Sequence, residues 1–321
     1  MACFHPMKAW KNGDGKGFHF QRQSMDGTPT LLPCGQCIAC KLERSKMWAT
    51  RIVHEAQMHT ENTFLTLTYN EKNLPTDGSL VKQHAVDFMK KYRSYVSYHE
   101  GKKIRFFLVG EYGEQFSRPH YHAIIFGHSF MDSELFMVNR QTGEAYFTSD
   151  RLSRLWNMGH TVIGDVTPQS AAYCARYCVK KVTGRKQREG HYVRTDEYGV
   201  VTTEVDPEFA LMSRNPGIGK SWWEKYGHTD AADDHLVLDG NKVKIPRYYD
   251  NLEDPEIMFQ IKQDRKERAR EFQEFATQDK KVGHKEVLIK RGTLSQSERT
   301  AQSRANKLIR SYENGQDVFS I

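Results

Sequence analysis

The chain has 321 residues, of which 38% are hydrophobic and 12% aromatic, so it can bury one large core or two smaller ones. Its formal charge of +7 agrees with a polyanionic partner such as nucleic acid, but many basic proteins bind none. No run approaches the roughly 20 apolar residues that cross a bilayer, and the first residues show no apolar segment of a signal peptide. We therefore expect a cytoplasmic protein without a membrane partner.

Three closely spaced cysteines mark the N-terminal segment. Cys34, Cys37 and Cys40 form a C-x2-C-x2-C pattern in a stretch that glycines and prolines divide into loops and short strands. Cysteines in the cytoplasm are more often reduced or metal-bound than paired in disulfides. Three thiolates at this spacing can bind a structural zinc ion, with Cys3 or His5 as the fourth ligand. The alternatives are iron–sulfur ligation, which lacks a following Cys-Pro here, and three cysteines that bind nothing.

Helices and strands alternate from residue 42 onward. Apolar periodicity predicts helices at residues 42–59 and 82–98, and a short helix is expected at 149–157. Residues 255–281 and 295–314 are predicted to form charged helices with little apolar face. Runs of β-forming residues predict strands at residues 64–69, 104–112, 121–127 and 161–166. A further helix begins with Thr167 as its N-cap and Pro168 in its first turn, and it runs to about residue 183.

The order of these elements indicates the fold class. Two neighbouring strands joined by a short connector imply a mainly antiparallel sheet, so we expect an α+β fold with a central sheet flanked by helices. We expect a cysteine-rich segment with a helix over residues 1–60 and a central core over 61–190. The C-terminal region, 191–321, is predicted to hold a polar hairpin at 190–206 and charged helices.

A pair of histidines is the first candidate for chemistry. His120 and His122 lie two residues apart at the start of a predicted strand, so their side chains point to one face. A hairpin would bring Glu111 from the preceding strand beside them, and two imidazoles with a carboxylate suit a catalytic Mg²⁺ or Mn²⁺ ion. Glu114 competes for the carboxylate role but lies in the predicted turn. The alternative, two histidines at an exposed strand end, is commoner for a bare His-x-His.

A pair of tyrosines is the second candidate. Tyr173 and Tyr177 are four residues apart on the capped helix and share a face with Lys180, whereas Cys174 and Cys178 occupy a neighbouring stripe that can pack. Core packing is the default interpretation of such an aromatic pair. A phenolate can also attack phosphorus to form a covalent ester, and a lysine can bind the phosphate or stabilise its developing charge.

Together these elements resemble the HUH endonuclease superfamily, whose core is a ferredoxin- or RRM-like sheet. Its apolar-Thr strand matches FLTLTY at 64–69, its His-hydrophobe-His motif matches 120–122, and its Tyr-x-x-x-Tyr motif with a lysine matches 173–181. The two-tyrosine form is similar to the rolling-circle replication initiation proteins of microviruses of the gokushovirus type. Residues 32–51 and 212–219 also resemble that group, and the resemblance covers about residues 1–225.

The resemblance implies an endonuclease that nicks the viral origin strand through a 5′-phosphotyrosyl intermediate. The released 3′-OH would prime rolling-circle DNA replication, and the displaced strand would be rejoined into a circle. The implied partners are origin and single-stranded DNA with a host helicase and DNA polymerase, in the cytoplasm of the bacterial host. The implied residues are two nucleophiles and a lysine with three metal ligands, namely Tyr173, Tyr177, Lys180, His120, His122 and Glu111.

Basic residues beside these motifs are candidate contacts to the DNA backbone. They are Arg118, Lys181, Arg185 and Lys186. A solvated loop is the alternative for the run after the tyrosines. The segment 217–221 hints at a phosphate-binding loop, but a Walker motif needs glycine where Arg214 stands, so we expect no ATP binding.

Three rival functions remain at this stage. A histidine-dependent nucleotide hydrolase would need a third alternating histidine, where the chain has Ile124. A non-enzymatic DNA-binding protein would form no covalent adduct with DNA. A plasmid replication protein or a transposase would share the superfamily, but the paired tyrosines and the N-terminal cysteines favour the phage type.

Overall fold

A computed structural model describes most of the chain. The described residues are 3–14, 17–23, 29–113, 115–140, 143–182, 187, 189–195, 198, 200–231, 233–238 and 240–282. The predicted helix at 295–314 lies outside them. No helix within the described part has the length and apolar character needed to cross a bilayer.

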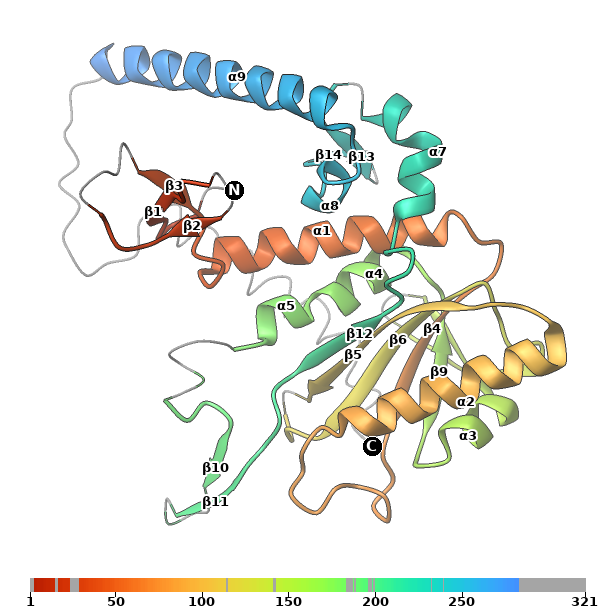
Figure 1. Ribbon diagram of the computed structural model, residues 1–321. Helices are drawn as coiled ribbons and strands as arrows, with labels where there is room; N and C mark the ends of the chain where they lie inside the picture. The colour runs from red at the N-terminus through yellow and green to blue at the C-terminus, as the bar shows by residue number, and fades with distance from the viewer. Residues whose placement is uncertain are drawn as a thin grey trace.

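A seven-stranded sheet forms the centre of the molecule (Figure 1). Its strand order is β12-β5-β6-β4-β9-β8-β7, and every neighbouring pair is antiparallel. The strands are β4 (Asn62–Thr68), β5 (Arg105–Tyr112), β6 (Pro119–Phe126), β7 (Ser133–Val138), β8 (Ala145–Ser149), β9 (Thr161–Gly164) and β12 (Phe209–Met212). The α+β class and the mainly antiparallel sheet expected from the sequence are confirmed.

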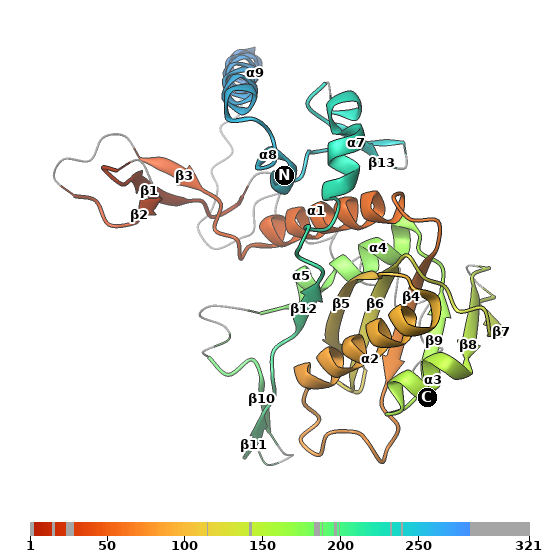
Figure 2. The same ribbon diagram turned by 45° about the vertical axis from the view of Figure 1, so that its right-hand side comes forward.

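Helices cover both faces of this sheet (Figure 2). One face carries α1 (Ile38–Ala56), α4 (Pro168–Ala175) and α5 (Tyr177–Lys180), and the other carries α2 (Lys82–Glu100) and α3 (Asp150–Trp156). Side chains alternate between the faces. Phe107 and Ile124 therefore join the core beneath α1 and α4, whereas Leu108 and Ile125 join the core beneath α2 and α3. This alternation decides which strand residues can meet α4.

The helix that begins at Thr167 starts as predicted but ends early. Thr167 and Ser170 form a reciprocal capping box, with Pro168 in the first turn. The predicted continuous helix to residue 183 is wrong, because α4 ends at Ala175 and a separate turn of helix, α5, follows. At the junction the Arg176 N–H donates to the carbonyl three residues back, at Tyr173, which tightens the helix there.

Three strands of the main sheet, β7, β8 and β12, were not predicted. In β7 the side chains are mostly exposed on both faces, so no alternation of apolar and polar residues marks this edge strand. The four-residue β12 lies far along the chain, beyond residue 190, yet pairs with β5 through residues such as Phe209 opposite Gly110. A Cβ on Gly110 would lie 2.9 Å from the Phe209 ring, so this close approach requires glycine.

Smaller elements surround α1. The N-terminal segment forms a three-stranded sheet beside the start of α1, and α7 lies near its other end (Figure 1). A separate aromatic core, away from the two faces of the sheet, contains Trp222, Trp223 and Tyr249. The ring of His54 on α1 stacks on Trp222. The remaining elements are β1 (Met7–Lys11), β2 (Phe18–His19), β3 (Thr30–Leu32), β10 (Val193–Thr195), β11 (Val201–Glu204), α7 (Lys220–Asp230), β13 (Leu236–Leu238), β14 (Asn241–Val243), α8 (Arg247–Asp250) and α9 (Pro255–Val282).

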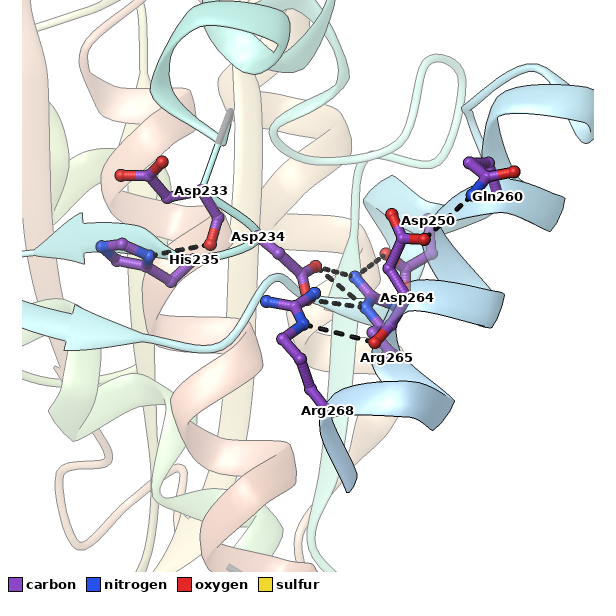
Figure 3. Close-up of polar contacts among 8 residues, drawn as sticks. All are labelled: Asp233, Asp234, His235, Asp250, Gln260, Asp264, Arg265 and Arg268. Carbon is purple, nitrogen blue, oxygen red and sulfur yellow. Dashed lines mark hydrogen bonds and ion pairs between the residues drawn. The ribbon is translucent and has the colours of Figure 1, made fainter. Parts of the chain in front are cut away.

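The long charged helix α9 is held at its N-terminal half by a cluster of ion pairs (Figure 3). The Arg265 guanidinium donates to the carboxylates of both Asp234 and Asp250, and Arg268 donates to Asp234 as well. These two carboxylates raise the pKa of Arg265 further above its ordinary value. A guanidinium that bridges two carboxylates has a fixed geometry, so α9 is tied to α8 and to the segment before β13.

Candidate functional site

The candidate carboxylate and the candidate histidines lie on neighbouring strands. In the antiparallel pair β5–β6, Glu111 is directly opposite His120. Glu111 is completely buried, and Lys180 of α5 lies 3.1 Å from its Oε2 as an ion pair. This contact is outside hydrogen-bond geometry, and neither carboxylate oxygen accepts a hydrogen bond. A buried carboxylate without hydrogen bonds is costly, and the ion pair with Lys180 offsets part of that cost.

His122 lies between a threonine and a candidate nucleophile. Its Nδ1 lies 3.1 Å from Thr66 Oγ1 of β4, and its Nε2 lies 3.0 Å from the Tyr173 hydroxyl of α4. Phe64 stacks on the imidazole and meets the Tyr173 ring edge-on, so both rings are fixed by packing. Burial lowers the pKa of His122 well below its ordinary value, and the nearby His120 lowers it further. The imidazole is therefore neutral at physiological pH.

His120 presents its second ring nitrogen to the same space. Its Nδ1 lies 3.1 Å from the Arg118 carbonyl, and because a carbonyl only accepts, Nδ1 carries the proton. The lone pair of Nε2 is thus left for a ligand. The rings of His120 and His122 are 4.9 Å apart, and burial lowers the pKa of His120 as well, although Glu111 opposes this.

These contacts define a histidine–tyrosine site that consists of Glu111, His120, His122, Tyr173 and Lys180. Two of its candidate ligand groups already have partners, because the Tyr173 hydroxyl lies against His122 and the Lys180 ammonium lies against Glu111. In the part of the chain that the structure describes, no three ligand atoms of this site lie as close together as those of the cysteines below. Two neutral imidazoles and a buried carboxylate nevertheless form a ligand set that fits a divalent cation.

Tyr177 lies apart from this site. Its ring packs against Phe107 at 6.1 Å between centroids, and its hydroxyl interacts with the Cys178 thiol. Burial raises the pKa of Tyr177 above its ordinary value. The tightened turn at Arg176 separates the two tyrosines, so the single helical face expected for Tyr173 and Tyr177 is replaced by two adjoining units.

The four cysteines of the N-terminal segment come together, and we call them the cysteine cluster: Cys3, Cys34, Cys37 and Cys40. Their sulfur atoms all lie within 4.8 Å of one another, and all four are free thiols. Cys3 is thus placed as the fourth member. Burial raises the pKa of Cys37, but backbone N–H groups of Cys40 and Phe4 donate to its sulfur and bring that pKa to about 6. Such a cluster can bind a metal ion.

The candidate DNA contacts have varied surroundings. Arg118 donates to the exposed Glu71 carboxylate at 2.7 Å and to the Tyr69 carbonyl at 2.9 Å. Lys181 follows α5, and its carbonyl accepts a hydrogen bond from Lys41. Arg185 and Lys186 lie outside the described residues, as does Glu114.

Sequence reasoning missed three residues of this region. Thr66 contacts His122, the Arg176 guanidinium lies 4.7 Å from the centre of the Tyr173 ring, and Lys41 reaches the end of α5. Thr66 carried a signal in the sequence, because it lies two residues after Phe64 in a predicted strand. Its side chain therefore points to the same face of the sheet as that of Phe64. Lys41 carried none, since it lies 138 residues from its partner Val179.

Comparison with known proteins places the chain in a family. A family model for replication-associated proteins of the ORF2 type matches residues 62–182. The replication-associated protein VP4 of Bdellovibrio phage phiMH2K is 31% identical over 258 residues, which cover 78% of this chain and 76% of that protein. This chain belongs to the phage replication-associated protein family.

Two other relatives agree with this assignment. The family member ORF4 of Chlamydia phage 1 is 31% identical and covers 69% of this chain, which in turn spans 53% of ORF4. The family member ORF2 of Spiroplasma virus 4 is 27% identical, with 78% of this chain and 79% of ORF2 aligned. No solved structure shows a significant match. The resemblance to phage replication proteins drawn from the motifs is therefore confirmed, and the protein has a role in phage replication.

Proposed function

We propose that this protein is a metal-dependent DNA endonuclease and strand transferase that initiates rolling-circle replication of a phage genome. The observation that carries the proposal is the Tyr173 hydroxyl, which lies 3.0 Å from Nε2 of the neutral His122 beside a buried carboxylate and a lysine. A tyrosine in simple core packing needs none of these neighbours. They suit a phenol that must be oriented toward a phosphate.

The residues of the histidine–tyrosine site support a nicking step. If Thr66 accepts the proton of His122 Nδ1, then Nε2 accepts a hydrogen bond from the Tyr173 hydroxyl and fixes its direction. The phenol oxygen would form a bond to phosphorus as the bond from phosphorus to the 3′ oxygen breaks. The phenolic proton is lost and the leaving oxygen gains one, giving a 5′-phosphotyrosine and a 3′-OH. Lys180 would stabilise the charge on the phosphate oxygens.

Glu111, His120 and His122 are the proposed ligands of a Mg²⁺ or Mn²⁺ ion, for which Nε2 of His122 would exchange its hydrogen bond with the Tyr173 hydroxyl. A bound divalent ion polarises a phosphate oxygen and so supports attack on phosphorus. The orphaned oxygens of Glu111 support this assignment, because a cation would satisfy them. For the cysteine cluster we propose zinc, in a separate site that does not contact the reacting phosphate.

Tyr177 is the proposed second nucleophile. It would cleave the regenerated origin after one round of synthesis, and transfer of the first 5′-phosphate to the new 3′-OH would close the displaced strand into a circle. Its position on α5, next to Lys180, supports a role in the same region, although its ring packs against Phe107. Rejoining needs no ATP, because the phosphotyrosyl ester retains the energy of the original bond.

The proposed partners are origin DNA, single-stranded DNA, and the helicase and DNA polymerase of the bacterial host, in whose cytoplasm the protein would act. Arg118 and Lys181 are proposed backbone contacts on either side of the site, and Arg185 and Lys186 are proposed to extend them. The segment at 217–221 is poorly suited to ATP. The Gly219 N–H, which a phosphate would need, donates to the buried Glu55 carboxylate at 2.6 Å.

A covalent-adduct assay tests the proposal. Purified protein is incubated with an oligonucleotide that carries the phage origin, in Mg²⁺ or Mn²⁺, and the products are separated under denaturing conditions. We expect a protein attached to the 5′ end of the cleaved strand. A Tyr173→Phe/Tyr177→Phe variant that still forms the adduct would rule out the tyrosine mechanism. A wild-type protein that binds origin DNA but never forms an adduct would favour the non-enzymatic alternative.

A further inference from the structure

The sulfur atoms of the cysteine cluster lie within 4.8 Å of one another, and one pair has the spacing of a tetrahedral zinc site. Cys3 Sγ and Cys37 Sγ are 3.8 Å apart, far beyond the ~2.05 Å of a disulfide. Four sulfurs around a zinc ion at about 2.3 Å form a tetrahedron whose edge is about 3.8 Å. Four protein ligands leave no open position, which is the arrangement of a structural zinc site rather than a catalytic one.

Backbone hydrogen bonds to sulfur support thiolates at this place. The Cys34 N–H donates to Cys3 Sγ at 3.2 Å, and the Cys37 N–H donates to Cys34 Sγ at 3.3 Å. Hydrogen bonds to the ligand atoms of a metal site orient them and stabilise their charged form. The loop between β3 and α1 therefore already holds two sulfurs in place by its own backbone.

The cluster joins two segments and ends inside α1. Cys3 precedes β1, whereas Cys34 lies between β3 and α1 and Cys40 lies in the first turn of α1. A metal at this point would tie both ends of the N-terminal sheet to the start of the helix. The first turn of α1 is thus its most constrained part.

Lys41, the residue after Cys40, reaches from α1 to the C-terminal end of α5. Lys41 Nζ donates to the carbonyl of Val179 and to the carbonyl of Lys181, both at 2.9 Å. These carbonyls lie at the C-terminal end of α5, where a helix leaves acceptors unsatisfied. Lys41 therefore caps the short helix that carries Tyr177 and Lys180.

We propose that Cys3, Cys34, Cys37 and Cys40 bind one structural zinc ion, and that this ion, through Lys41, holds α5 in position. The ion fixes the first turn of α1, and the ammonium of Lys41 then fixes the two carbonyls that end α5. Zinc binding displaces the remaining thiol protons to solvent and changes no oxidation state. The part of this inference that concerns catalysis rests on the proposed function of Tyr177 and Lys180, for which Lys41 is a positioning residue.

The zinc content of the purified full-length chain tests the first step. We expect one zinc per chain by elemental mass spectrometry, and a large loss of zinc in a Cys34→Ser/Cys37→Ser variant. Protein that is folded by circular dichroism but carries no zinc, or carries iron instead, would overturn the assignment. Zinc that survives in the double serine variant would do the same.

The Lys41→Met variant tests the link between the cysteine cluster and α5 without replacing a proposed zinc ligand. We expect it to keep its zinc but to exchange the backbone hydrogens of residues 177–182 faster than wild type, because α5 loses its cap. Lys46→Met is the matched control, since Lys46 is an exposed lysine on the same helix. Unchanged exchange in Lys41→Met, or equal acceleration in both variants, contradicts the link.

Joining of DNA strands provides the functional readout. Nicking uses Tyr173 with Lys180 of α5, whereas joining also uses Tyr177 of α5. A displaced α5 should therefore lower both products but joining more strongly, and we expect the ratio of joined to nicked product to fall about tenfold in Lys41→Met. A general loss of stability would lower both products alike and would contradict a positioning role. If wild type forms no adduct while the zinc content and hydrogen exchange behave as expected, the proposed function fails and the structural link stands.

Discussion

The histidine–tyrosine site and the cysteine cluster are both built from side chains that bind metals, but they arrange their donor atoms differently. In the cysteine cluster the four sulfurs converge to within 4.8 Å, and backbone N–H groups orient them. In the histidine–tyrosine site Glu111 and the two histidines lie on a pair of strands, while Tyr173 and Lys180 contact them from separate helices. A closed set of four sulfurs suits a structural metal site, whereas a catalytic site needs an open position for its substrate.

Loss of both proposed nucleophiles should have the largest effect on DNA cleavage and none on the cysteine cluster. Replacing Tyr173 and Tyr177 together by phenylalanine should abolish the covalent adduct and leave the zinc content at one per chain. The free energy of unfolding should fall by only about 1 kcal/mol per lost buried hydroxyl bond. Adduct formation and chemical denaturation of the same preparation measure both quantities. A large loss of stability would indicate that the tyrosines serve mainly the core.

Neutralising the buried carboxylate should have the next largest effect. Glu111→Gln keeps the shape of the side chain but removes the charge that faces Lys180, so we expect nicking to fall about 10²–10³-fold. The Mn²⁺ concentration needed for half-maximal activity should rise. The exposed Glu71, which pairs with Arg118, offers the control Glu71→Gln, for which we expect little change. Equal effects of the two substitutions would refute a special role for Glu111.

A threonine-to-valine change tests the contact that orients His122. Thr66→Val conserves volume and removes the hydroxyl beside His122 Nδ1, so we expect about a tenfold weaker response to Mn²⁺ with zinc binding intact. Thr68, which is more exposed on the same strand, provides the matched control Thr68→Val. If both variants respond to Mn²⁺ as wild type does, the orientation of His122 does not depend on Thr66.

The smallest effect comes from a histidine outside both regions. Burial lowers the pKa of His54 from 6.5 to about 3, so the folded protein holds it neutral. Below pH 6.5 the unfolded chain binds a proton that the folded one does not, and stability should fall by up to roughly 1.4 kcal/mol per pH unit until about pH 3. Denaturation between pH 7 and 5 should show a shallower slope in His54→Gln. This pH dependence of stability must be known before acid is used to compare the histidine–tyrosine site with the cysteine cluster.

Several parts of the fold followed from sequence because local patterns and packing agree there. The strands around residues 64–69, 104–112 and 121–127 are long and apolar, and they lie at the centre of the sheet as β4, β5 and β6. The edge strands β7 and β12 gave no usable pattern, since β7 is exposed on both faces and β12 has four residues. Their existence depends on partners far along the chain, which a local pattern does not contain.

The candidate site also has features that the sequence could predict and features that it could not. Strand alternation and a hairpin were sufficient to predict Glu111 beside His120, because register follows from the short connection between β5 and β6. The separation of Tyr177 from Tyr173 was not predictable, since neither proline nor glycine marks the helix break at Arg176. The cap that Lys41 gives to α5 depends on tertiary packing of α1, so no spacing in the sequence could indicate it.

The helix break at Arg176 has a consequence for the order in which the two tyrosines would act. On one rigid helix, a DNA end attached to Tyr173 would fix the location of Tyr177 throughout the reaction. With two units joined by a tightened turn, α4 is anchored to the sheet through Tyr173 and Cys174, while α5 is anchored to α1 through Lys41. Both units pack against α1, but they meet at a turn rather than in one continuous helix. In the proposed reaction, Tyr177 could therefore change its distance from a DNA end attached to Tyr173, and that movement could set the order of the two cleavage events.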